Sequence, residues 1–171
     1  MENTQEYIDF ILSDEFLRIS RYTDYQISEC KYDFIDKIFP VTDNMENSSR
    51  FIIDIVKLRN SQHFQIVKDS MIISLQIFCR FFRILETGME EYYLTELVKF
   101  KLKIARIVRS LMYHELYVNA QLLCFRLIRF RLNFSDIKRP TSIWEMVYYS
   151  SITEIESHGI EYREPSISGN Y

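Results

Sequence analysis

The sequence predicts an all-α fold, a single-domain bundle of six or seven helices, and three observations support this class. Only 3 Gly and 3 Pro occur in 171 residues, so the chain lacks the turns that a many-stranded β fold needs. Hydrophobic residues make up 47% of a chain of one-domain length, which is enough to build a core. Most segments also carry apolar side chains three and four residues apart, which is the helical period.

The first forty residues contain three helix signals. Thr4 is expected to begin a first helix, and Ser13, followed by two acidic residues, is expected to begin a second. The second helix is expected to turn Phe16, Leu17 and Ile19 inward. Residues 26–39 predict one amphipathic helix that ends before a proline; its inward positions are Ile27, Cys30, Phe34, Ile35 and Ile38.

Residues 40–47 are polar and predict a loop, and residues 49–60 predict a short helix after it. An Asn or Ser at 47–49 is expected to cap this helix. Its inward side chains are expected to be Phe51, Ile52, Ile55, Val56 and Leu58.

The segment 64–87 is expected to be the central apolar helix of the domain. Eleven of the fifteen residues from Met71 to Leu85 are apolar, and most of the polar side chains fall on a strip roughly 60° wide. Most of the remaining circumference is apolar, so we expect neighbours on several sides. Gly88 is expected to end the helix.

Three further helices are predicted over residues 89–115, 119–132 and 142–159. The last has a capping-box spacing between Ser142 and Glu145, and Gly159 is expected to close it. Residues 1–159 are therefore the predicted helical domain. Residues 160–171 are acidic, lack apolar periodicity and are expected to form a flexible tail.

Charge is distributed unevenly along the chain, although the net charge is only −3. Residues 96–139 hold 10 basic and 3 acidic residues, whereas residues 1–70 hold 8 basic and 13 acidic residues. The spacing of the basic residues predicts exposed faces on two successive helices, opposite the apolar ones. The candidate binding residues there are Lys99, Lys103, Arg106, Arg126 and Arg129.

These basic faces have three interpretations. They could meet RNA phosphates, or an acidic protein partner. They could also be solvated faces that offset the acidic 1–70 region within the same fold. Arg80 and Arg83, on the polar strip of the central helix, are candidates of a second kind. We expect them to pair with acidic residues among the first 39, and the alternative is that they line a groove or pocket.

Catalytic and metal-binding motifs are absent from the sequence, so we expect no enzyme activity, no metal and no cofactor. Three cysteines, Cys30, Cys79 and Cys124, are odd in number and far apart, which fits a reducing compartment. The start of the chain is polar and acidic, and arginines interrupt the longest apolar run. These features predict an intracellular, cytoplasmic protein with no membrane span.

The function expected from these observations is non-enzymatic. We expect a protein–protein interaction module, an inhibitor or adaptor, acting through an apolar groove or a dimer face. Its partner would be another protein, or a second copy in a homodimer. One alternative is an RNA-binding helical protein that uses the basic 96–139 region. The other is a sensor domain that binds an apolar small ligand.

Overall fold

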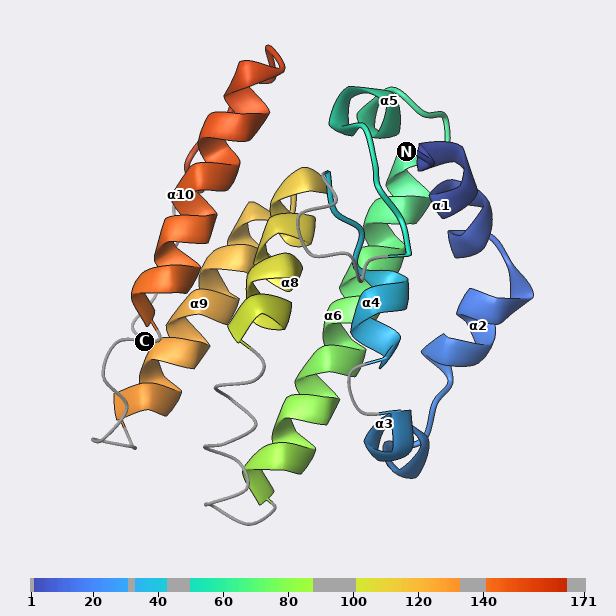
Figure 1. Cartoon of the computed structure of the whole chain (residues 1–171), viewed down its shortest axis with the longest axis vertical. Helices are drawn as coiled ribbons and strands as arrows, with labels where there is room; N and C mark the ends of the chain where they lie inside the picture. Colours follow the sequence, from blue (N-terminus) through green and yellow to red (C-terminus); the bar gives the residue numbers. More distant parts are fainter. Residues whose placement is uncertain (1, 31–32, 43–49, 88–100, 133–140, 166–171) are drawn as a thin grey trace.

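The computed structural model describes residues 2–30, 33–42, 50–87, 101–132 and 141–165, and it confirms the all-α class (Figure 1). These ranges contain nine helices, more than the six or seven predicted. The N-terminal half contains α1 (Thr4–Ile11), α2 (Asp14–Ser20), α3 (Asp24–Cys30), α4 (Asp33–Ile38), α5 (Ile55–Arg59) and α6 (Phe64–Thr87). The C-terminal half contains α8 (Lys101–Tyr113), α9 (Tyr117–Leu132) and α10 (Thr141–Ser157).

Of the helix caps predicted from the sequence, Ser13 is confirmed, Thr4 is wrong as a cap, and the cap at 47–49 lies outside the described residues. Ser13 precedes α2, and its Oγ accepts a hydrogen bond from the backbone N–H of Phe16 at 3.4 Å. Thr4 does begin α1, but its buried hydroxyl accepts from the backbone N–H of Asp54 instead of capping its own helix. The inward orientation predicted for Leu17 is wrong, because this side chain is 46% exposed.

The predicted helix over residues 26–39 forms as two shorter helices. Thr23 and Gln26 exchange backbone-to-side-chain hydrogen bonds of 2.8 and 3.2 Å, a capping box that begins α3 two residues before the predicted start. The chain enters α4 at residue 33, and both helices pack on α6. Four of the five predicted core positions are nevertheless confirmed, since Ile27, Phe34, Ile35 and Ile38 are each at most 2% exposed, whereas Cys30 is only partly buried.

The prediction of a helix over residues 49–60 is wrong for the first half of this range. Within its described part, only α5 is helical. Phe51 to Ile53 are extended, and Ile52 forms a parallel bridge with Val41. Two hydrogen bonds, of 3.1 and 2.7 Å, join Val41 to the residues on either side of Ile52. Asn3 binds both the N–H and the carbonyl of Ile52. These distant partners satisfy the backbone groups that a helix would otherwise have paired.

The helix predicted over 64–87 is confirmed as α6, and it is buried along one stripe. The members of this stripe are three or four residues apart: Val67, Ser70, Met71, Ser74, Ile77, Phe78 and Phe81. The opposite side reaches solvent, and two apolar side chains on the flank of the stripe, Ile66 and Ile73, are also exposed. The predicted stop at Gly88 lies outside the described residues.

The helix predicted over 89–115 is confirmed from Lys101 onward as α8, and residues 88–100 lie outside the described part. Every residue from Ile104 to Val108 and from Ser110 to His114 is buried. α9 and α10 pack on one side of α8, and segments of the N-terminal half contact it from the other (Figure 1). Among the described helices, α8 therefore has neighbours on several sides, the position predicted for 64–87.

Candidate functional site

The two described basic residues predicted to be exposed on α8 both form ion pairs within the fold. Nζ of Lys103 lies 2.5 Å from Oδ1 of Asp36 on α4, and the guanidinium of Arg106 binds the same oxygen. Arg106 is only 1% exposed, so its predicted exposure is wrong. A buried guanidinium needs an anionic partner, and the acidic N-terminal half provides one.

The other basic candidates cannot be placed at the level of side chains. Lys99 lies outside the described residues. Arg126 and Arg129 belong to α9, and Arg83 belongs to α6, in parts of those helices where the side chains are not described. Whether these four residues bind anything therefore stays a prediction.

Arg80 forms the internal ion pair that was predicted for it. Its Nη2 and Nε lie 2.7 and 3.1 Å from Oδ1 of Asp24, at the start of α3. Both side chains are well exposed, so this pair contributes at most about 1 kcal/mol to stability. The pair links α3 to α6, and the guanidinium of Arg80 is bound to Asp24 within the fold.

Two further polar groups lie buried against the N-terminal half, Ser110 of α8 and His114, which directly follows α8. Ser110 Oγ donates to the carbonyl of Pro40 at 2.6 Å. His114 Nδ1 donates to the carbonyl of Ser110 at 2.6 Å, so its Nε2 accepts from the hydroxyl of Tyr7 at 3.0 Å. Burial lowers the pKa of His114 to about 4, and the positive charge of Arg59 acts in the same direction. His114 is thus a neutral connector between the two halves.

Arg59, at the end of α5, is a connecting residue that the sequence did not identify. Its guanidinium donates to the backbone carbonyls of Met112 and Tyr113, each at 3.0 Å. It also lies 3.2 Å from a carboxylate oxygen of Glu115. Cations at a helix C-terminus stabilise the last carbonyls, so this nearly buried side chain holds the end of α8.

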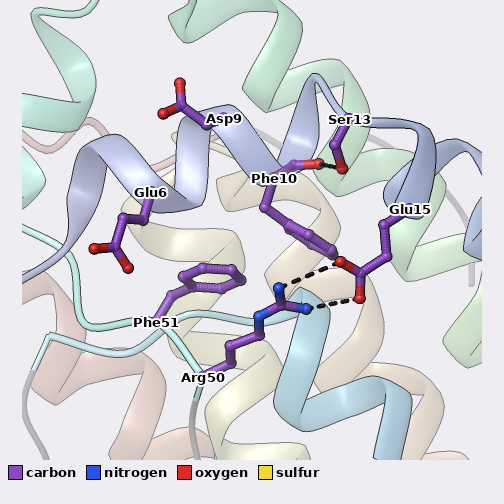
Figure 2. A pocket seen from close by; sticks show the side chains of 7 residues that line it. All are labelled: Glu6, Asp9, Phe10, Ser13, Glu15, Arg50 and Phe51. Atoms are coloured by element: carbon purple, nitrogen blue, oxygen red, sulfur yellow. Dashed lines mark hydrogen bonds and ion pairs between the residues drawn. The ribbon is translucent and has the colours of Figure 1, made fainter.

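A cleft of about 340 Å³ lies between α1 and the extended segment at residues 50–51 (Figure 2). The guanidinium of Arg50 lies 4.9 Å from the ring centre of Phe10 and 5.1 Å from that of Phe51. The same guanidinium binds both carboxylate oxygens of Glu15, at 2.8 and 3.3 Å, and these bonds hold the pKa of Glu15 below its usual value. Arg50 therefore covers the two aromatic rings that line this cleft.

A second cleft, of about 270 Å³, lies where the N-terminus meets α10. Its polar lining includes Glu2, Asp54, His158 and Glu154. Glu154 accepts from the hydroxyls of Thr42 at 2.6 Å and Tyr113 at 2.8 Å, so its carboxylate already has partners. The described residues contain no cluster of three or more His, Cys, Asp or Glu arranged to hold a metal ion.

Two uncharged runs lie on α9 and α10, although the same helices carry charged residues beyond them, at Arg126, Arg129 and exposed Glu156. Neither residues 116–125 nor residues 146–153 include an Asp, Glu, Lys or Arg, although such residues make up 26% of the chain. The two runs lie side by side, because Gln121 Nε2 donates to the hydroxyl of Tyr148 at 2.8 Å across the helix pair. Four apolar side chains are exposed on these runs: Val118 (43%), Leu122 (40%), Met146 (68%) and Tyr149 (64%). We refer to them as the α9–α10 face.

Tyr162 lies beside the α9–α10 face and beyond the predicted end of the helical domain at residue 159. Its ring packs edge-on against Tyr117 of α9, with ring centres 4.9 Å apart, and its hydroxyl binds that of Tyr148. Ile160 also packs against the core. Contact with the helices therefore continues past residue 159, and residues 166–171 lie outside the described part.

Comparisons with protein-family models, with curated proteins and with solved structures found no match for this chain. Its function must therefore be argued from its own residues. None of the helices that the structure describes combines the length and apolar character that a membrane span requires. The sequence alone shows that residues 116–125 and 146–153 carry no charge. That these two runs lie side by side follows only from the packing of α9 against α10.

Proposed function

We propose that this protein acts by binding another protein chain through the α9–α10 face, in a non-enzymatic role as an inhibitor or adaptor. The observation that carries this proposal is the exposure of four large apolar side chains on two adjacent uncharged helical runs. Binding surfaces of proteins are depleted in charge at their centre and enriched in Tyr and Met, and both residue types occur here. Clustered apolar exposure of this kind is a mark of interaction sites.

The RNA-binding alternative has less support from the described residues. Phosphate binding requires basic side chains that can exchange their counterions for phosphates. Lys103 and Arg106 are instead bound to Asp36, and Arg106 is buried. Of the five basic candidates, only Lys99, Arg126 and Arg129 would then remain to bind phosphates.

The apolar-ligand alternative also has less support. Sites for apolar small ligands are concave and mostly lined by apolar side chains. The two described clefts instead have carboxylates at their walls, three in the first and three in the second. Neither of them matches the chemistry of an apolar ligand.

The proposal is tested by photo-crosslinking in cells that naturally express the protein. A photoreactive amino acid is placed at Met146 or at Leu122, and a matched variant carries it at Arg18, an exposed position on α2. We expect a discrete protein adduct from positions 146 and 122 and none from position 18. The second copy of the chain counts as a protein here. Equal labelling from all three positions, or none from any, would contradict the proposal.

A further inference from the structure

We infer that residues 160–165 form a strap that regulates access to the α9–α10 face and is held in place by the side chain of Tyr162. This inference rests on the proposed function and adds how that same site is controlled. Tyr162 contacts both helices of the face at once. Its ring packs edge-on against Tyr117 of α9, with ring centres 4.9 Å apart, and its hydroxyl binds the hydroxyl of Tyr148 on α10.

The base of the strap is fixed, because α10 ends in a Schellman motif. The N–H of Gly159 bonds to the carbonyl of Glu156 at 2.9 Å, and Gly159 has the left-handed φ of 76° that this motif uses. The N–H of Ile160 reaches back to the carbonyl of Ile155 at 3.4 Å. Ile160 also packs against the core, so the strap begins from a defined position.

Tyr162 provides the attachment of the strap beyond this base. No backbone hydrogen bond joins residues 161–165 to the rest of the described chain. Arg163 binds Glu161 within the strap at 3.1 Å, and both side chains are exposed. Within the described residues, the hydrogen bonds and ring contacts between this segment and the helices all come from Tyr162. Loss of the contacts of this one side chain therefore frees the strap up to its base.

Release of Tyr162 leaves the buried hydroxyl of Tyr148 with a partner. Gln121 Nε2 donates to the same hydroxyl at 2.8 Å, and this bond joins α9 to α10 without the strap. A buried polar group that loses every hydrogen bond raises the free energy of the open state, and that cost does not arise here. The ion pair of Arg163 also stays within the strap when it opens.

The two tyrosines that Tyr162 covers adjoin the α9–α10 face. Tyr117 directly precedes Val118, and the ring of Tyr148 lies perpendicular to that of Tyr149, with centres 5.6 Å apart. Release of the strap adds both tyrosines to the exposed surface, and tyrosine is enriched in protein interfaces. A partner that lies across both helices uses this surface only in the open state. Its apparent affinity is then reduced by the fraction of molecules that are open.

The first measurement tests whether Tyr162 holds the strap, using chymotrypsin on the purified full chain. Cleavage after Tyr162 requires that its side chain leave the helices, so the rate follows the open population. Tyr148→Phe removes the hydroxyl that Tyr162 binds and keeps the buried ring. We expect at least about threefold faster cleavage after Tyr162, since one hydrogen bond is lost. Tyr149→Phe is the matched control, and it should cleave as the wild type does.

The second measurement tests regulation, using the photoreactive group at Met146 in cells that naturally express the protein. Tyr162→Ala removes the side chain that holds the strap closed. We expect at least about threefold more of the same adduct than in the wild type, because every molecule is then open. Tyr25→Ala, which removes a 73% exposed tyrosine from α3, is the control and should leave the yield unchanged. Circular dichroism verifies that all variants are folded.

The direction of the change decides between regulation and direct binding. An adduct whose yield stays the same or falls in Tyr162→Ala would overturn the inference and leave the proposed function standing. Equal cleavage after Tyr162 in Tyr148→Phe and Tyr149→Phe would also overturn the inference. If Met146 gives no adduct in any variant, both the proposed function and its regulation by the strap are overturned.

Discussion

The helices α6 and α8 both pack against several other elements, but α8 is the more fully buried of the two. α6 has the more apolar sequence, yet Gln65, Asp69 and Ile73 on one side of it reach solvent. α8 begins with a basic stretch, yet its residues 104–108 and 110–113 are all buried. The difference shows that the apolar content of a helix does not determine how many sides of it are covered.

Burial of α8 depends on partners that come from distant parts of the chain. Asp36 pairs with Arg106, the carbonyl of Pro40 accepts from Ser110, and Tyr7 donates to His114. On α6 the buried Ser74 donates to the carbonyl of Ser70 within the same helix, at 3.1 Å. Polar groups of α8 therefore connect the two halves of the fold, whereas this polar group of α6 is satisfied locally.

The largest expected effect separates the ion pairs of the two helices. Asp36→Asn removes the negative charge beside buried Arg106, and we expect the free energy of unfolding to fall by about 3–5 kcal/mol. Asp24→Asn removes the partner of exposed Arg80 and should cost at most about 1 kcal/mol. Urea unfolding of both variants measures the difference. Equal small losses would mean that Arg106 does not depend on Asp36.

An effect of similar size is expected from His114 as the pH falls. The pKa of His114 is about 4 in the folded protein, below its ordinary value of 6.5. The unfolded chain therefore takes up the proton first, and stability present above pH 6.5 is lost as the pH falls to about 4. Full loss amounts to about 3 kcal/mol for this group. His114→Gln should flatten the pH dependence of urea unfolding between pH 6.5 and 4, and an unchanged slope would rule out His114 as its cause.

The smallest expected effect compares two buried serines. Ser110→Ala removes the donor to the Pro40 carbonyl and should cost about 1–2 kcal/mol. Ser74→Ala should be close to neutral, because the Ser70 carbonyl keeps its place in the backbone bonding of α6 and Ala favours a helix. Thermal unfolding of the two variants measures both changes. A larger loss from Ser74→Ala would contradict the distinction between α6 and α8.

Local sequence by itself determined the all-α class, the start of α2 at Ser13 and the extent of α6. These features depend on side-chain caps and on the 3.6-residue period, which act over a few residues. The pairing of Arg80 with an acid among the first 39 residues was also predictable, because an arginine on a mostly apolar helix needs a partner. The sequence did not show that this partner is Asp24.

Tertiary structure alone decided which helix is surrounded and where the candidate face lies. Residues 51–53 have helical spacing but extend, because Val41 and Asn3 bind their backbone across the fold. Arg106 has the spacing of an exposed residue but is buried, because Asp36 approaches from a separate helix. The uncharged runs 116–125 and 146–153 become one surface only when α9 packs beside α10. The period of a helix reports which residues share a side, whereas the neighbour on that side comes from a distant part of the chain.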